Sequence, residues 1–141
     1  MNHKQMQQRC PGCKFIKRVL LQDYKFIYDG YSAIRKGAVA NIIENRGGIV
    51  WGSIFEISEE HLKALDSFEG YPEYYDKKII QVKDENSNSY DAWVYFRNGQ
   101  KQGQPSEEYH KVVIQGAKDC NLPKEYIKNN LLKKRAAANT L

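Results

Sequence analysis

The sequence of 141 residues lacks several features that would each point to a particular class of protein. No apolar run approaches the ~18 residues that a membrane-spanning helix needs. The first residues, MNHKQMQQRCPG, are polar and basic and contain no apolar core of the kind that a secretory signal has. We therefore expect a cytosolic protein without a membrane segment. At this length, one domain with its own core is the simplest organisation.

Cysteine and histidine are scarce. The three cysteines, Cys10, Cys13 and Cys120, are odd in number, which argues against a disulfide framework. The CPGC segment has the spacing of a redox pair or of half a zinc site, but no second pair and no histidine motif follows to complete four ligands. Pro-Gly also fits the turn after a short helix, and we favour this interpretation. We expect no metal and no cofactor.

The excess of positive charge is concentrated at the C-terminal end. Residues 124–135 hold five basic side chains and one acidic side chain, a net of +4 out of a formal net charge of +5. Little excess remains for a nucleic-acid surface elsewhere, and a basic helix that ends in RAAANTL is typical of a solvated chain end. We predict one domain over residues 1–133, a basic disordered tail over residues 134–141 and no nucleic-acid partner.

Aromatic and β-branched residues with partial alternation predict three pairs of strands. The first pair is residues 14–21 and 24–30, around a turn at Gln22-Asp23. The second is residues 38–43 and 49–57, around the glycine pair of ENRGG. The third is residues 75–84 and 89–96, around ENSN.

Helix signals interrupt and follow these strands. Ser58 is the predicted N-cap of a helix that ends at Gly70, and Leu62, Leu65 and Phe68 are expected to face the core. Further helices are predicted over residues 3–9, from Ser106 to residue 121, and from residue 123 onward. The order of elements indicates an α+β fold, a small curved and mostly antiparallel β-sheet or barrel with flanking helices.

One carboxylate stands out. Glu69 follows the apolar stripe of the predicted helix and precedes a Gly-Tyr-Pro turn rich in aromatic rings. Removal of a carboxylate from water costs free energy unless the group is neutral or has a partner or a role. Glu69 is therefore either a solvated or turn-bonded residue of the last helical turn, or a functional group with a raised pKa.

Four motifs in this order carry a resemblance to a known family: RCPG after a short helix, VWGSIFEI, LDSFEGYP followed by YY, and PSEEYHKVVIQGAKDCNLP. The chain resembles the gamma-glutamylcyclotransferases from Asn2 to about Asn130. The resemblance implies an intramolecular aminolysis, in which the free α-amine of a small γ-glutamyl compound attacks its own side-chain carbonyl. Ring closure gives 5-oxoproline and releases an amino acid or amine, without metal, nucleotide or covalent intermediate.

The resemblance also implies roles for individual residues. The family's catalytic acid/base is the glutamate of LDxxEG, which here is Glu69, and we expect a collar of rings that includes Phe68 and Tyr71. Tyr95 matches a pocket tyrosine of the family, and Tyr75 matches the aromatic residue that opens the strand after the EG turn. Both tyrosines are candidate substrate-binding residues, and both could equally serve in packing.

The chain departs from the family pattern at its start. Family members have a first strand and a YGSN loop, whose amides hold the glutamyl carboxylate, just before the segment that resembles residues 1–12. From this departure we expect either that the natural product begins upstream of Met1 or that the chain is a short form. We favour the first reading, which predicts a cyclotransferase that is active if this N-terminal element is supplied. The second reading predicts a catalytically incompetent binding or regulatory domain. A redox or nucleic-acid protein has less support. The γ-glutamyl substrate and the oligomeric state stay open.

Overall fold

The structure is a computed structural model that describes residues 1–132 of the chain. The predicted domain end at residue 133 and the tail over residues 134–141 lie outside these residues. The elements in chain order are α1 (His3–Arg9), β1 (Lys14–Ser32), β2 (Gly37–Glu56), α2 (Glu59–Glu69), β3 (Asp76–Lys83), β4 (Ser89–Phe96), α3 (Glu107–Asp119), α4 (Lys124–Tyr126) and a π-helical turn, η1 (Ile127–Leu132).

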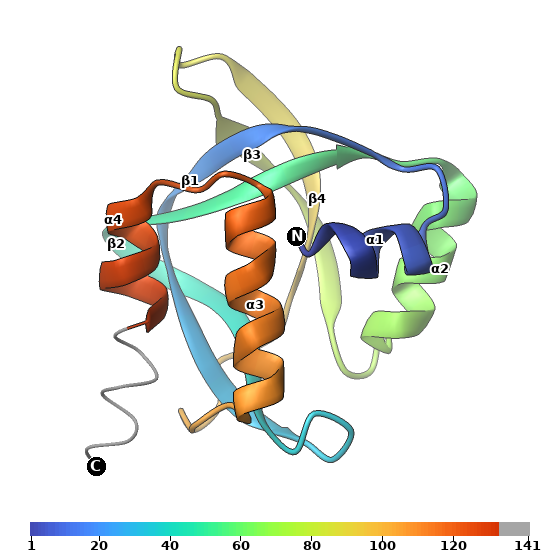
Figure 1. The fold of residues 1–141 in the computed structure, drawn as a ribbon, viewed down its shortest axis with the longest axis vertical. Helices are drawn as coiled ribbons and strands as arrows, with labels where there is room; N and C mark the ends of the chain where they lie inside the picture. Colours follow the sequence, from blue (N-terminus) through green and yellow to red (C-terminus); the bar gives the residue numbers. More distant parts are fainter. Residues whose placement is uncertain (133–141) are drawn as a thin grey trace.

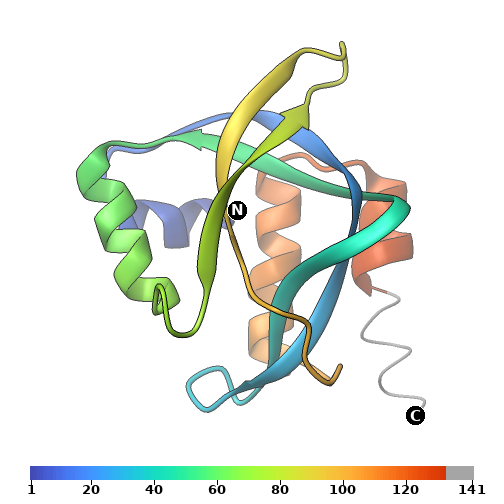
Figure 2. The same cartoon turned by 180° about the vertical axis from the view of Figure 1, so that it is seen from behind.

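The four strands form one antiparallel sheet in the order β2-β1-β3-β4. The two long strands, β1 and β2, bend strongly, so that the sheet curves around the centre of the molecule (Figure 1). Helices α3 and α4 lie together on one side of the sheet, and α1 and α2 lie beside each other at its end (Figure 2). This arrangement confirms the predicted α+β fold with a curved antiparallel sheet and flanking helices.

The first two predicted strand pairs are wrong in their pairing. The segments of the first predicted pair are the two halves of one strand, β1, and those of the second are the halves of β2. Strand β1 pairs with β2 along its whole length, from Lys14 opposite Glu56 to Ser32 opposite Gly37. The hairpin turn therefore lies at residues 33–36. The third predicted pair, β3 with β4, is confirmed.

An irregularity in the pairing of β1 with β2 replaces the two expected turns. Asp23 has a positive φ of 66°, and the register shifts between Gln22 and Tyr24. The Asp23 carboxylate accepts a hydrogen bond from the Gly47 amide at 2.9 Å, which ties the two bulged segments together. A Cβ atom on Gly48 would lie 2.5 Å from the Tyr24 carbonyl oxygen, so this close approach requires glycine. A glycine pair bends the long strand here and does not end it.

Helix α2 has the predicted ends but not all of the predicted burial. The Ser58 side chain accepts from the His61 amide, and Gly70 closes the helix in the left-handed conformation with φ 65°. Phe68, which was expected to face the core, is 59% exposed. The reason is that α2 packs beside α1 at the end of the sheet, and the ring of Phe68 lies under the Arg9 guanidinium at 4.8 Å.

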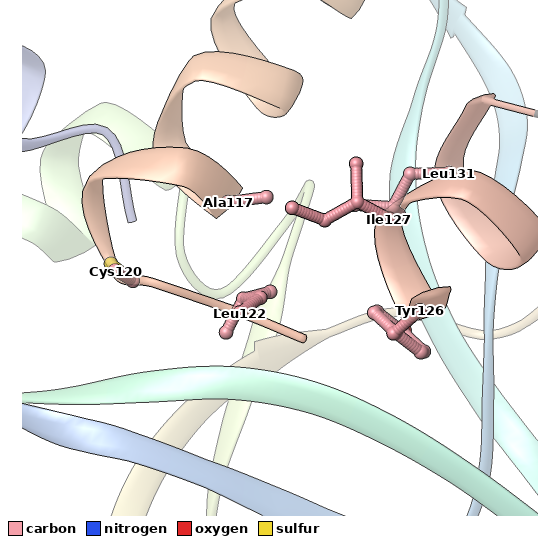
Figure 3. Packing of buried hydrophobic residues seen from close by; sticks show 6 residues of the cluster. All are labelled: Ala117, Cys120, Leu122, Tyr126, Ile127 and Leu131. Atoms are coloured by element: carbon pink, nitrogen blue, oxygen red, sulfur yellow. The ribbon is translucent and has the colours of Figure 1, made fainter. Parts of the chain in front are cut away.

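The main core cluster joins α3 to the C-terminal turns. Figure 3 shows its buried members, which are Ala117, Cys120, Leu122, Tyr126, Ile127 and Leu131. Partly buried rings of the sheet, among them Phe26, Trp51 and Phe55, pack against this cluster. A second cluster around Val19 and Val82 lies in the sheet itself. The C-terminal turns therefore belong to the core of the domain.

The CPGC segment is buried in the structure. Cys10 caps the end of α1 and is 0% exposed, and Cys13 is 4% exposed. Burial raises the pKa of both thiols, which disfavours the reactive thiolate. This environment supports the turn interpretation over a redox pair. Across residues 1–132, the structure has no helix long and apolar enough to cross a membrane.

Candidate active site

A cleft of about 760 Å³ opens between α1, the end of α2 and the hairpin turn that joins β1 to β2. The hairpin turn and the end of α2 lie on the same side of the molecule in both views (Figures 1 and 2). The charged side chains in the wall of the cleft are Arg9, Arg35 and Glu69. Tyrosine rings from three other segments complete the wall. The cleft is large enough for a small polar molecule.

Glu69 reaches the cleft because α2 ends there. The amide of Gly70 donates to the carbonyl oxygens of the last helical turn, and its left-handed conformation turns the chain away. The Glu69 side chain is left in the wall of the cleft with 26% of its surface exposed. The helix cap at Gly70 thus places the carboxylate of Glu69, the residue that the LDxxEG motif indicates, in the cleft wall.

The carboxylate of Glu69 is loosely held. Its closest charged partner is Arg9, whose Nη1 lies 3.8 Å from Glu69 Oε1, beyond hydrogen-bond distance. Burial raises the pKa of Glu69, and the positive charges of Arg9, the chain amino terminus and Arg35 oppose this shift without cancelling it. A carboxyl whose pKa is raised and whose oxygen atoms accept no hydrogen bond from residues 1–132 is suited to accept and return a proton.

Two tyrosine hydroxyls in the cleft are fixed by one backbone unit of β2. The Tyr75 hydroxyl donates to the Ala40 carbonyl oxygen at 2.7 Å, and the Ala40 amide donates to the Tyr109 hydroxyl oxygen at 3.0 Å. Burial raises the pKa of both tyrosines, so they stay protonated. The hydroxyl proton of Tyr75 is already donated to the Ala40 carbonyl oxygen. Among residues 1–132 no acceptor takes the Tyr109 proton, so this hydroxyl can donate into the cleft.

Comparisons with known proteins show the family of the chain. A family model described as the AIG2-like family matches residues 49–129, which include α2 and Glu69. The chain belongs to this family. The gamma-glutamylcyclotransferase of mouse is 28% identical over 123 residues, which are 84% of this chain and 65% of the mouse protein. The gamma-glutamylcyclotransferase of cattle is 30% identical over 125 residues, 85% of this chain and 66% of the bovine protein.

A solved structure of a gamma-glutamyl cyclotransferase superposes with a TM-score of 0.84 at 25% identity, covering 89% of this chain and 78% of that chain. The resemblance to the gamma-glutamylcyclotransferase family is therefore confirmed. The chain spans just under two thirds of the length of the curated relatives that it matches.

The AIG2-like fold brings only one of the two candidate tyrosines into the cleft wall. Tyr75 lines the cleft with Glu69. The hydroxyl of Tyr95 instead donates to Asp66 Oδ1 at 2.6 Å, and Lys77 binds both oxygens of the same carboxylate at 3.0 and 2.7 Å. Substrate binding by either tyrosine stays a prediction.

The collar of rings around Glu69 differs from the expected one. Phe68 lines the cleft but is largely exposed, and Tyr71 is 37% exposed, with the Lys77 ammonium 4.5 Å from its ring centroid. Tyr75 and Tyr109 supply the buried aromatic surface instead. The expectation failed because neighbours along the chain need not be neighbours across a cleft.

Sequence reasoning missed Arg9 and Arg35 as parts of this AIG2-like cleft. Arg9 ends α1 and Arg35 lies in the hairpin turn, and neither lies in the segment that the family model matches. Arg9 is the first residue of the RCPG motif, but that motif indicates a turn after a helix and not a cleft residue, and no local pattern marks Arg35. Both belong to the cleft through contacts with other elements, Arg9 with Phe68 of α2 and Arg35 with Tyr109 of α3. Tyr109 was also missed as a cleft residue, and the PSEEY signal that begins α3 could have pointed to it. Residues 1–132 contain no group of three or more His, Cys, Asp or Glu side chains placed to hold a metal ion.

Proposed function

We propose that the chain catalyses the cyclotransferase reaction, in which a small γ-glutamyl compound with a free α-amine closes to 5-oxoproline and releases an amino acid or amine. The observation that carries the proposal is the loosely held Glu69, whose pKa is raised by burial, in the cleft of an AIG2-like fold. The names of the curated relatives support the same reaction.

Glu69 is the proposed general acid/base. The α-ammonium group first loses a proton to the Glu69 carboxylate, and the free amine then attacks the γ-carbonyl carbon to form the five-membered ring. The C–N bond to the leaving group breaks as that nitrogen is protonated. Two protons leave the α-nitrogen and two reach the departing nitrogen, so Glu69 ends ionised, as it began. Proton transfer of this kind contributes about 10²- to 10⁴-fold.

The cleft also has to hold the substrate in a curled shape, because ring closure depends on the approach of the amine to its own carbonyl. The Tyr109 hydroxyl, with its proton directed to no acceptor among the described residues, is the proposed donor to the γ-carbonyl oxygen, where negative charge develops. Tyr75 shapes the same wall through its hydrogen bond to Ala40. The reaction is expected to take place in the cytosol, as the sequence predicts.

The test is the product balance of the purified chain. With γ-glutamyl-alanine we expect 5-oxoproline and alanine in equal amounts, and no glutamate. The matched control substrate carries an acetyl group on the α-amine, and it must not react because its nitrogen cannot attack. Release of glutamate would indicate hydrolysis in place of cyclisation. Binding of the substrate without turnover would favour the alternative, a binding or regulatory domain.

A further inference from the structure

Arg35 occupies an unusual position in the cleft wall. It lies in the turn between β1 and β2, and its backbone amide donates to the Ser32 hydroxyl at 3.2 Å. The guanidinium carbon lies 5.0 Å from the centroid of the Tyr109 ring, so the planar cation is held against an aromatic face inside the cleft. The attraction between a cation and a ring face holds the guanidinium at this place and uses none of its N–H groups as hydrogen-bond donors to an acceptor atom.

The charges of the cleft do not balance. Arg9 and Glu69 form a loose pair at 3.8 Å, whereas no ion pair or hydrogen bond joins the Arg35 guanidinium to any carboxylate among residues 1–132. Two positive side chains and one negative side chain leave a net charge of +1 in the wall. An unpaired positive charge in a half-buried cleft favours an anionic ligand, because the cleft screens the charge less than bulk water does.

We propose that Arg35 binds a carboxylate group of the substrate. The inference rests on the proposed function, which supplies such a group in two ways. Every γ-glutamyl compound with a free α-amine carries a carboxylate on the same carbon, and a γ-glutamyl amino acid carries a second one on its leaving group. Arginine matches a carboxylate with two parallel hydrogen bonds, which fixes the orientation of the ligand as well as its charge.

The charge balance predicts which substrates the cleft prefers. A γ-glutamyl amino acid with a neutral side chain has one ammonium and two carboxylates, a net charge of −1 that complements the +1 of the wall. A γ-glutamyl amine with a neutral side chain has a net charge of zero. We therefore expect the first kind of substrate to bind more tightly, and Arg35 to be the residue responsible.

The experiment compares Arg35→Gln with Lys36→Gln in the 141-residue chain. Lys36 is the next residue of the same turn, is exposed and lies outside the cleft wall, so its replacement removes the same charge from the same hairpin. We expect Arg35→Gln to raise KM about tenfold or more with little change in kcat, since a charge-assisted bidentate contact is lost. Lys36→Gln should retain the KM of the unchanged chain. Equal KM values for the two variants would overturn the proposal.

The choice of substrate identifies the carboxylate. If Arg35→Gln raises KM for both γ-glutamyl-alanine and γ-glutamyl-ethylamine, the bound group is the α-carboxylate. If it raises KM for γ-glutamyl-alanine alone, the bound group is that of the leaving amino acid. Either result supports the proposal.

A binding measurement separates this proposal from the proposed function. Glutarate, a dicarboxylate that cannot cyclise, is titrated into the unchanged chain and both variants, and binding is followed by NMR chemical shifts. We expect glutarate to bind the unchanged chain and Lys36→Gln, with about tenfold weaker binding to Arg35→Gln, and glutaramide to bind none of them tightly. This result would stand even if no 5-oxoproline were formed. Failure of glutarate to bind the unchanged chain, or equal binding to all three, would contradict a carboxylate site at Arg35.

Discussion

Two carboxylates that lie in different regions of the molecule have opposite surroundings. Asp29 on β1 is 0% exposed and is fully bonded: Arg97 donates to its side chain, and the Asn41 amide and the Gln100 backbone amide donate to Oδ2 at 3.1 and 2.9 Å. Among residues 1–132, Glu69 in the cleft has one ion-pair partner, Arg9, at 3.8 Å. The hydrogen bonds of Asp29 fix it as a structural carboxylate. Glu69 has no such hydrogen bonds from residues 1–132, so its oxygen atoms can accept a proton or a ligand.

The two regions touch each other through the tyrosines. The Arg97 guanidinium lies 5.2 Å from the centroid of the Tyr74 ring and 5.1 Å from that of the Tyr75 ring, and both rings line the cleft. The Nε and Nη1 atoms of Arg97 have no hydrogen-bond partner among the described residues. The buried ion pair between Asp29 and Arg97 therefore supports the cleft wall that contains Glu69, and the charge of Arg97 is balanced by Asp29.

Replacement of Asp29 is expected to have the largest effect on stability. Asp29→Asn would leave the buried charge of Arg97 uncompensated, which costs about 3–5 kcal/mol in the free energy of unfolding. Urea unfolding measures the loss, and Asp91→Asn, at an exposed position of β4, is the control. An equal, small effect of both substitutions would remove the contrast between a structural and a functional carboxylate.

Asp66 lies in the same helix as Glu69, one turn before it. The two residues therefore test the contrast between a hydrogen-bonded and a loosely held carboxylate within one helix. Burial alone would raise its pKa, but the hydrogen bonds from Lys77 and Tyr95 outweigh this effect and hold the pKa of Asp66 below its usual range. Asp66→Asn is expected to cost about 1–3 kcal/mol in the free energy of unfolding. Thermal unfolding would show the loss, whereas Glu69→Gln should change the melting temperature little. Reversal of this order would mean that the hydrogen-bond pattern does not separate the two roles.

Substitutions of the two candidate tyrosines test the same comparison between structural and cleft residues, with smaller expected effects on stability. Tyr75→Phe removes the hydrogen bond to Ala40, and Tyr95→Phe removes the hydrogen bond to Asp66. Each variant should lose about 1 kcal/mol of stability or less, which is the net contribution of a single hydrogen bond. Only Tyr75 lines the cleft, so only Tyr75→Phe is expected to change KM. Steady-state kinetics of both variants decide the point, and a larger KM effect of Tyr95→Phe would give Tyr95 the substrate contact.

The smallest expected effect is a pH dependence of stability. Because burial raises the pKa of Glu69, the folded chain holds this proton more tightly than the unfolded chain, in which the pKa is about 4.3. The stability that the group contributes is present below that pH and is lost as the pH rises through the folded pKa. Glu69→Gln cannot ionise, so it should gain stability relative to the unchanged chain as the pH rises from about 4 to 7. Urea midpoints at several pH values measure the difference, and a difference that is independent of pH would contradict the raised pKa.

Local signals in the sequence predicted the elements whose ends are chemically marked. Ser58 and Gly70 bound α2, Ser106 caps α3, and the hairpin of β3 and β4 forms as expected. Glu69 could be chosen from its motif, since the cap at Gly70 fixes its position. These features depend on residues that lie close together along the chain.

The rest depends on contacts between distant residues. A glycine pair such as Gly47-Gly48 can form a hairpin turn or a bulge, and the Asp23 carboxylate on the opposite strand decides between them. In the same way, Arg9 and Arg35 belong to the cleft only because α1 and the hairpin turn lie against the end of α2. Neither pairing leaves a pattern in the local sequence.

The most direct measurement is the rate of 5-oxoproline formation by Glu69→Gln beside Glu73→Gln. Both variants lose one carboxylate in the same stretch of chain, but Glu73 is exposed and lies outside the cleft wall. We expect kcat of Glu69→Gln to fall about 10²- to 10⁴-fold, because the amide cannot carry the proton, while Glu73→Gln keeps the unchanged rate. Normal turnover by Glu69→Gln would contradict the assignment of Glu69 as the acid/base.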